Sequence, residues 1–257
     1  MAFFERHHPS DPFIRTPGIS SAWCPGCGIG VVVNVFLQAL GRSDKSTDSI
    51  QIVWSDLGCT GNIAPFLKIP NTQSPIGSLF ETAVRVRKTH PGSLPVLFLS
   101  DSDFMVMGID RLLQLCRSGE NLLILYINSS LYHLLFENKK IQPVLFKKHI
   151  APSRSETPFN MPLLFDRYGA SYIARWTPLH CWRLRRSIEE AFEKKGMSFI
   201  EIISPCLMPI AGDGQLGFSI DRMGSHQSGT LIQHRANTEE LDTRQEGELL
   251  IGKFIDR

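Results

Sequence analysis

The clearest regularity in this chain is an alternation of short apolar runs with longer, partly polar segments. The apolar runs at 94–99 and 122–127 are continuous, as expected of strands that are covered on both faces of a parallel sheet. A further strand is expected at 198–203. The segments with helical character cover residues 79–88, 104–117 and 179–194. This order predicts an α/β fold with a mostly parallel sheet and helices on both faces.

The segment before this region adds one helix and one strand. Residues 29–40 are apolar on most sides, which is typical of a buried helix, and Gly41 is expected to close it as a C-cap. A strand is expected at 49–54. Short loops follow the predicted strands at 55–62, 100–103, 128–130 and 204–206. Because the carboxyl ends of parallel strands meet at one edge of a sheet, these loops are expected to converge on a ligand-binding rim.

Composition and charge narrow the class of protein. The 257 residues, 42% of them hydrophobic, are enough for one large α/β domain, and a formal net charge of +2 does not favour a nucleic acid or a membrane surface as the partner. No window approaches the roughly 18 apolar residues of a membrane span, and no secretory leader is recognisable. We therefore expect a cytoplasmic protein without a membrane span.

The repeating pattern weakens beyond Gly212. We expect residues 1–212 to form the main domain and residues 213–257 a C-terminal extension, whose apolar stretch at 248–256 docks on a partner. A basic cluster at 183–186 has two interpretations, a solvated helix face or a contact for an acidic partner.

Four cysteines lie in tight, loop-like sequences. Cys24 and Cys27 form a Cys-x-x-Cys pair in the run Trp-Cys-Pro-Gly-Cys-Gly, and Cys59 and Cys206 lie in the sequences Gly-Cys-Thr-Gly and Ser-Pro-Cys. Six cysteines are too few for a disulfide scaffold of this length, so such a pair indicates metal or redox chemistry. The pair precedes a helix, which favours the thiolate form. Four thiolates suit an iron–sulfur cluster or zinc, and buried thiols without a ligand are the third interpretation.

The combination of motifs points to a known family. The cysteine motifs, an Asp-x-Asp loop and an Asn-Ser loop one βα step later resemble those of the β subunits of 2-oxoacid:ferredoxin oxidoreductases, over most of residues 20–210. The resemblance implies a thiamine diphosphate-binding fold in which Mg²⁺ binds the diphosphate and a [4Fe–4S] cluster lies nearby. It also implies that Cys24, Cys27, Cys59 and Cys206 ligate that cluster.

The magnesium site is assigned by position within the family pattern. Asp101 stands where the first ligand is expected, and Ser129 follows the next strand with a hydroxyl oxygen; Asn128 is the alternative, and Leu131 offers its carbonyl. By resemblance the cofactor-binding set is Cys27, Gly28, Gly58, Cys59, Thr60, Ser100, Asp101, Ser102, Asp103, Ser129 and Leu131. No catalytic residue is assigned to this chain.

The sequence also departs from the family pattern. Ser100 and Ser102 replace the two glycines that normally flank the aspartate, and Ile29 replaces a histidine after the Cys-x-x-Cys-Gly run. Serine narrows the backbone conformations available near a phosphate. Asp103 is expected to hold its loop by an Asx-type hydrogen bond, and His133 to have a structural or surface role. The other two cysteines, Cys116 and Cys181, fall inside predicted helices and are expected to pack as small apolar side chains.

The resemblance implies an enzymatic function shared with other chains. It implies oxidative decarboxylation of a 2-oxoacid with coenzyme A, or the reverse, with electrons passing through the cluster to ferredoxin. A separate α-type subunit is expected to supply the pyrimidine-binding domain. Two other hypotheses stay open: a degenerate paralogue that keeps the cluster as an electron-transfer or scaffold subunit without thiamine turnover, and a zinc-binding interaction module. The loss of the flanking glycines motivates the first of these.

Overall fold

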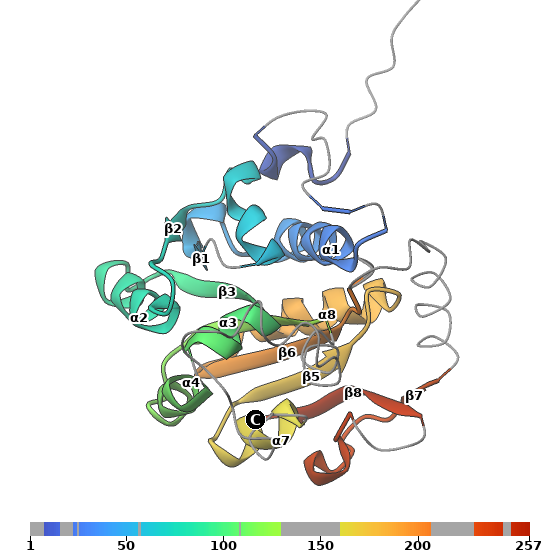
Figure 1. Cartoon of the computed structure of the whole chain (residues 1–257). Helices are drawn as coiled ribbons and strands as arrows, with labels where there is room; N and C mark the ends of the chain where they lie inside the picture. Colours follow the sequence, from blue (N-terminus) through green and yellow to red (C-terminus); the bar gives the residue numbers. More distant parts are fainter. Residues whose placement is uncertain are drawn as a thin grey trace, which may run out of the picture.

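The fold is a single eight-stranded sheet covered by helices (Figure 1). The computed structural model describes residues 8–15, 23–24, 26–55, 58–107, 109–129, 160–206, 229–243 and 248–257. The strands are β1 (Ile50–Trp54), β2 (Asn71–Gln73), β3 (Leu94–Ser100), β4 (Leu122–Asn128), β5 (Tyr172–Trp176), β6 (Met197–Ile203), β7 (Thr230–Ile232) and β8 (Leu249–Asp256). The helices are α1 (Gly28–Arg42), α2 (Leu79–Thr89), α3 (Asp101–Met107), α4 (Ile109–Arg117), α7 (Met161–Arg167) and α8 (Cys181–Phe192), and short 3₁₀ turns include Cys59–Asn62.

The strand order is β2-β1-β3-β4-β6-β5-β8-β7. All neighbouring pairs are parallel except β5 and β8, which run antiparallel. The mostly parallel α/β fold is therefore confirmed. The expected boundary at residue 212 stays a prediction, but the structure adds that β8, within the expected docking stretch, pairs with β5 of the same sheet.

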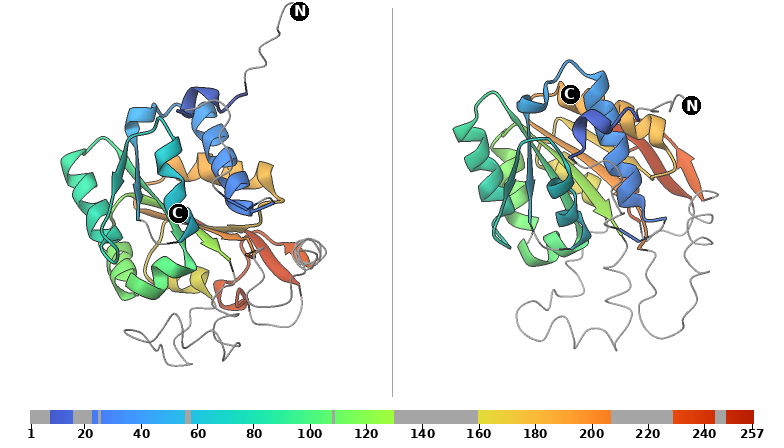
Figure 2. Two further views of the ribbon diagram at one scale, coloured as in Figure 1. Left: turned by 45° about the horizontal axis from the view of Figure 1, so that its top comes forward. Right: turned by 90° about the horizontal axis from the view of Figure 1, so that it is seen from above.

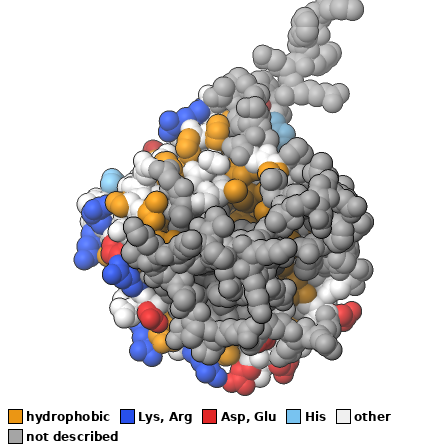
Figure 3. Space-filling model, viewed as in Figure 1, with side chains coloured by type: hydrophobic (Ala, Val, Ile, Leu, Met, Phe, Trp, Pro, Cys, Tyr) orange, Lys and Arg blue, Asp and Glu red, His pale blue; other side chains and the backbone are white. Residues whose placement is uncertain are grey.

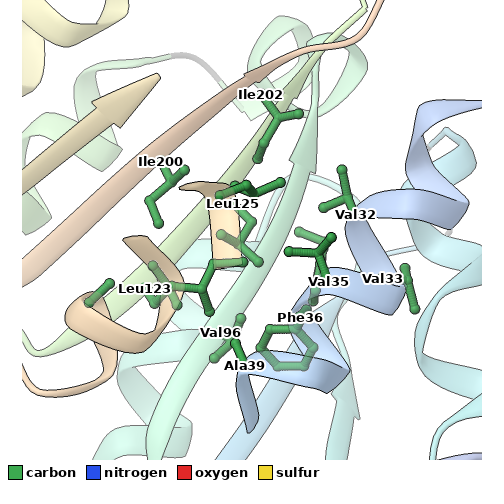
Figure 4. Close-up of a cluster of buried hydrophobic side chains, with 14 of the residues drawn as sticks. Val32, Val33, Val35, Phe36, Ala39, Val96, Leu123, Leu125, Ile200 and Ile202 are labelled. Atoms are coloured by element: carbon green, nitrogen blue, oxygen red, sulfur yellow. The ribbon is translucent and has the colours of Figure 1, made fainter. Parts of the chain in front are cut away.

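Alternate residues of each central strand face two separate hydrophobic layers. On one face, Val32, Val35 and Phe36 of α1 pack against Val96 and Leu125 of the sheet (Figure 4). Helix α8 lies beside α1 on this face (Figures 1 and 2). Apolar residues recur along α1 at helical spacing, so burying that stripe stabilises the helix more than its β-branched residues disfavour it. Both helices are held where their N-terminal ends reach the carboxyl edge of the sheet.

The opposite face is covered by α2, α3, α4 and α7. Phe80 of α2, Phe104 of α3 and Phe165 of α7 belong to this layer, together with Tyr126 and Phe199 of the sheet. Phe165 stacks on Phe199, and Phe104 meets Tyr126 edge to face, which are the two favourable aromatic geometries. Helices therefore cover both faces, as expected for strands with continuous apolar runs.

Two helix boundaries differ from the sequence expectation. Gly41 does not cap α1 but lies inside it, next to its last residue Arg42, and a Cβ at Gly41 would lie 3.2 Å from the Phe13 ring. The helix expected at 104–117 begins earlier, at Asp101, and is described as α3 and α4. The aspartates of the expected loop therefore lie in the first turn of a helix.

The described surface carries charges of both signs. On the face seen in Figure 3, basic side chains lie mainly along the left and lower margins and acidic ones along the lower margin. This mixture agrees with the formal net charge of +2. Among the described helices, none is long and apolar enough to cross a membrane.

Candidate functional site

The candidate site lies where four neighbouring parallel strands end. β1, β3, β4 and β6 are adjacent in the sheet, so the segments that follow them emerge side by side. Backbone hydrogen bonds join two of these segments directly. The N–H of Ser204 donates to the carbonyl of Asn128 at 2.8 Å, and the N–H of Cys206 donates to that of Ser129 at 3.0 Å. The loop that carries Cys206 is therefore fixed against the loop that carries the expected magnesium ligand.

Asp101 and Ser129, the two expected magnesium ligands, are in direct contact. Ser129 Oγ donates to Asp101 Oδ2 at 2.7 Å, and Tyr126 Oη donates to Asp101 Oδ1 at 2.6 Å. Only 1% of Asp101 is exposed. A carboxylate beside a hydroxyl supplies the hard oxygen ligands that Mg²⁺ prefers, so this pair fits the ion. Tyr126 fixes the orientation of the carboxylate from the side of β4.

Asp103 holds the start of α3 rather than facing open solvent. Its carboxylate accepts hydrogen bonds from the N–H and Oγ of Ser100, at 2.7 and 2.8 Å, and from Ser55 Oγ at 3.0 Å. Thr60 Oγ1 adds a longer bond of 3.4 Å. Burial raises the pKa of Asp103, and these hydrogen bonds offset part of that effect. An acidic side chain that reaches back to the N–H three residues earlier is half of a capping box, which explains why the helix begins here.

Gly58 lets the loop after β1 approach this turn. It has a φ of +74°, and a Cβ there would lie 3.0 Å from Ser100 Oγ and 3.4 Å from Ser102 Oγ. Positive φ is strained for other residues. The two serines that replace the family's glycines therefore occupy the space beside Gly58, and Ser100 Oγ is already bonded to Asp103.

The four expected cluster ligands are close enough to influence one another electrostatically. Burial raises the pKa of the Cys27 thiol; a hydrogen bond from the Ile29 N–H lowers it, while Cys59, Cys206 and Cys24 raise it further. Burial likewise raises the pKa of Cys59, with added repulsion from Cys206 and Cys24. Within the described segments, no group of three or more His, Cys, Asp or Glu side chains is arranged to hold a metal ion as it stands. The electrostatic effects show only that the other cysteines lie near Cys27 and Cys59.

The helix N-terminus favours the Cys27 thiolate as expected, through the N–H of Ile29, but other effects are larger in the protein chain alone. Desolvation and the neighbouring sulfurs outweigh the single N–H of Ile29. A bound cation would reverse this balance, because thiolate ligands are stabilised by the metal's charge. A cationic cluster would therefore stabilise the charged forms of Cys27 and Cys59, which the chain alone disfavours.

Two contacts bring the cysteine segments together. Trp23 Nε1 donates to the carbonyl of Cys59 at 2.9 Å, which joins the Cys-x-x-Cys turn to the loop after β1. Gly28 permits the other contact: a Cβ there would clash with Ser204 Oγ and lie 2.6 Å from Pro178 Cγ. The N-terminus of α1 thus lies directly against the segments before Cys206 and before α8.

A buried ion pair adjoins the part of the site that contains Asp101, Tyr126, Asn128 and Ser129, which we call the magnesium half. Arg175 and Glu201 are each 1% exposed, and Arg175 Nε donates to Glu201 Oε2 at 2.7 Å. Glu201 Oε1 accepts from Asn128 Nδ2 at 2.8 Å. Arg175 also donates to the carbonyls of Leu241, at 2.8 Å, and Leu250, at 3.4 Å. Asn128, the alternative magnesium ligand, therefore has its amide directed to Glu201, which leaves Ser129 as the closer partner of Asp101.

Several residues stand apart from the expectations. Leu131 and His133 lie outside the described residues. Cys116 is buried as expected of a packing residue, and burial raises its pKa to about 11. Cys181 is exposed at the start of α8, so the expectation that it packs in the interior is wrong. The sequence interpretation missed Tyr126, Arg175 and Glu201. The last two could have been noticed, because a charged residue inside an apolar strand, such as Arg175 in β5 or Glu201 in β6, needs a partner of opposite charge when it is buried.

Comparison with known proteins defines the family. The family described as thiamine pyrophosphate enzyme, C-terminal TPP binding domain, matches residues 58–202, more than half of the chain. The chain belongs to this family. The matched region of this TPP-binding domain runs from the Gly58 loop to β6, and so contains Asp101, Tyr126, Ser129 and Glu201.

Relatives of this TPP-binding domain confirm the resemblance to 2-oxoacid:ferredoxin oxidoreductases. The chain is 27% identical to the 2-oxoglutarate synthase subunit KorB of Methanothermobacter marburgensis, with 98% of this chain and 88% of the relative covered. It is 27% identical to the same subunit of Methanocaldococcus jannaschii, with 97% of this chain and 92% of the relative covered. It is 25% identical to the 2-oxoacid:ferredoxin oxidoreductase 2 β subunit of Aeropyrum pernix, with 72% of this chain and 60% of the relative covered.

A solved structure shares the fold of the TPP-binding domain. A chain of the 2-oxoglutarate:ferredoxin oxidoreductase from Magnetococcus marinus, solved with 2-oxoglutarate, coenzyme A and succinyl-CoA bound, superposes with a TM-score of 0.73 at 19% identity. The match covers 98% of this chain and 86% of the other.

Proposed function

We propose that this chain is the β subunit of a 2-oxoacid:ferredoxin oxidoreductase. In this proposal it binds thiamine diphosphate through Mg²⁺ and carries a [4Fe–4S] cluster on Cys24, Cys27, Cys59 and Cys206. The observation that carries the proposal is the contact between Asp101 and Ser129, at the sheet edge where the loop of Cys206 is hydrogen-bonded to the loop of Ser129. Membership of the TPP-binding family and the names of the relatives support the same function.

Each half of the site has a separate task in this proposal. Asp101 Oδ2 and Ser129 Oγ would ligate the ion that holds the diphosphate, and Tyr126 would keep the carboxylate oriented. When bound, thiamine diphosphate supplies the carbanion chemistry for decarboxylation, and the cluster accepts the electrons released. Burial of Asp101 and Asp103 excludes water from the diphosphate end of the site.

The proposed reaction needs partners. We propose an α-type subunit with the pyrimidine-binding domain, coenzyme A as acyl acceptor, ferredoxin as electron acceptor and a reducing cytoplasm as the compartment. Because the curated relatives named above include two 2-oxoglutarate synthase subunits, 2-oxoglutarate is the first 2-oxoacid to test. Pyruvate and branched 2-oxoacids belong in the same assay.

The test uses the complex of this chain with its partner subunits, prepared without oxygen. We expect about four iron and four sulfide per β chain from a cluster of this type. We also expect saturable, Mg²⁺-dependent binding of thiamine diphosphate, and reduction of a viologen dye that requires both a 2-oxoacid and coenzyme A. A colourless complex that contains zinc would contradict the cluster and favour an interaction module.

A degenerate paralogue is the second candidate, and one observation favours it. Ser100 and Ser102 fill the space next to Gly58, where the family pattern has glycines that let backbone approach a phosphate. This candidate predicts iron and sulfide in the complex but no saturable binding of thiamine diphosphate. The titration with Mg²⁺ therefore separates the two functions.

A further inference from the structure

Basic and apolar side chains lie at least partly exposed just before α8 and within its first two turns. Trp182 and Arg186 are four residues apart and Arg183 and Arg186 three apart, so these three share one side of the helix, and Leu179 precedes the helix two residues before Cys181. Trp182 is 58% exposed and Leu179 is 43% exposed. The opposite side of α8, which includes Leu184 and Ile188, is buried in the core. We call these four residues the α8 patch.

The charge of the α8 patch works against the stability of its own helix. The first turn contains no acidic residue. Positive side chains near a helix N-terminus are unfavourable, because the N-terminal end of the helix dipole is itself positive. Arg185 points elsewhere and pairs with Glu189 at 3.6 Å. In the described part of the chain, neither Arg183 nor Arg186 forms an ion pair with a carboxylate.

Two arginines of the α8 patch lie over aromatic rings instead. The guanidinium of Arg186 is 5.4 Å from the centre of the Trp182 ring, and that of Arg183 is 6.0 Å from the Trp176 ring. Stacking of this kind holds the planar group in place while leaving its N–H donors available. Exposed Trp and Arg are also the residue types that contribute most binding energy at protein interfaces.

The α8 patch lies next to the cysteine edge. Pro178, which precedes Leu179, lies against Gly28, the residue after Cys27. Ser204, two residues before Cys206, lies against the same glycine. A protein that covers the patch would therefore come close to two of the four thiols.

We propose that the α8 patch docks a small, acidic, iron–sulfur electron-carrier protein. The inference rests on the proposed function, because the carrier takes its electron from the cluster. Each transfer moves one electron from the reduced cluster of the enzyme to an oxidised cluster of the carrier, so every 2-oxoacid oxidised requires two such transfers. Carboxylates of the carrier pair with Arg183 and Arg186, and an apolar spot on it covers Trp182 and Leu179.

The test compares the assembled complex with one that carries Arg183→Glu and Arg186→Glu. The probe is an acidic 2[4Fe–4S] ferredoxin, whose binding is measured by calorimetry at low ionic strength without turnover. We expect its Kd to rise at least about tenfold in the double variant, and the affinity of the wild type to fall steeply with added salt. Viologen reduction and the size of the complex should not change.

Two further variants make the result specific. Lys88→Glu reverses another exposed charge, in the last turn of α2, and should leave ferredoxin binding unchanged. Arg186→Gln removes one charge with little effect on folding and should weaken binding by about threefold. Unchanged ferredoxin affinity in the double variant would overturn the docking proposal, and so would loss of complex assembly, since the patch would then be a subunit interface. Failure of the proposed function would show differently, as a wild-type complex without iron or without viologen reduction.

Discussion

The two halves of the candidate site are built on different principles. In the magnesium half, Asp101 is buried and accepts hydrogen bonds from Ser129 and Tyr126. In the cysteine half, Cys24 and Cys59 are exposed, and neighbouring cysteines add to the raised pKa of Cys27 and of Cys59. Hydrogen bonds between side chains therefore fix the first half, whereas the hydrogen bonds that hold the second half end on backbone carbonyls of Cys59 and Ser129.

This difference indicates what each half gains from its cofactor. The magnesium half is pre-organised, so an ion bound by Asp101 and Ser129 would replace their hydrogen bond with little rearrangement of the side chains. The cysteine half brings together groups that repel as thiolates, so a bound cluster would supply the attraction that the chain lacks. Variants in one half should then leave the other half measurably intact.

The largest effect is expected from Cys59→Ser. Removing one of four thiolates should abolish cluster binding and all viologen reduction, because the remaining three ligands cannot complete the site. Iron and sulfide analysis of the anaerobic complex measures this loss. Thiamine diphosphate binding should persist. Cys181→Ser is the matched control, since Cys181 is exposed at the start of α8 and should not affect iron content.

Glu201→Gln tests the support beneath the magnesium half. Arg175 would remain buried without a counter-charge, which typically costs about 3–5 kcal/mol of the free energy of unfolding. Urea denaturation of the isolated chain measures the change. Glu239→Gln is the control, because it breaks an ion pair with Arg167 in which both side chains are 63% exposed. It should lower the free energy of unfolding by less than about 1 kcal/mol. Equal losses in the two variants would show that burial of the pair has no energetic consequence.

Asp101→Asn should separate the two halves most clearly. A neutral amide is a weaker ligand for Mg²⁺, so we expect the affinity for thiamine diphosphate with Mg²⁺ to fall at least about 100-fold. Iron content should equal that of the wild type. Asp110→Asn, an exposed position in the first turn of α4, serves as the control for loss of one negative charge. Retained affinity in Asp101→Asn would remove Asp101 from the ligand set.

Tyr126→Phe should have the smallest effect of this series. It keeps the ring in contact with Phe104 but removes the hydroxyl that donates to Asp101. Loss of such an orienting hydrogen bond costs about 10-fold in metal affinity. Tyr172→Phe removes a hydroxyl that bonds Glu190 on α8, and should leave Mg²⁺ affinity unchanged. The ratio of the two affinities, measured by calorimetry, isolates the contribution of the Tyr126 hydroxyl.

The sequence predicted those parts of the fold that depend on local patterns. β3 and β4 were predictable because their apolar runs are continuous, and α2 because its apolar residues recur at helical spacing. The start of α3 was misjudged as a loop, although Ser100 and Asp103 form a capping pattern visible in the sequence. Gly41 was misjudged as a C-cap, although it lies inside α1 next to Arg42.

The residues of the candidate site also divide into those that the sequence identified and those that depend on contacts between distant parts of the chain. The family resemblance singled out Asp101, Ser129 and the four cysteines; the contact between Asp101 and Ser129 is present, and the grouping of the four cysteines stays a prediction. Tyr126 could not be selected, because its hydroxyl meets Asp101 only through the pairing of β3 with β4. Arg175 and Glu201 lie directly opposite each other in β5 and β6, so their partnership depends on strand register, which the sequence does not show.

The contacts of Arg175 with Leu241 and Leu250 also bear on how a nascent chain matures. Leu250 emerges from the ribosome 49 residues after Glu201, which takes roughly 2–10 s at synthesis rates of about 5–20 residues per second. During that interval β5 has no β8 to pair with, and its free backbone groups form an open edge that invites association with other chains. We therefore expect newly made protein to need chaperone protection late in translation, after the cofactor edge has formed and before the far side of the sheet is closed.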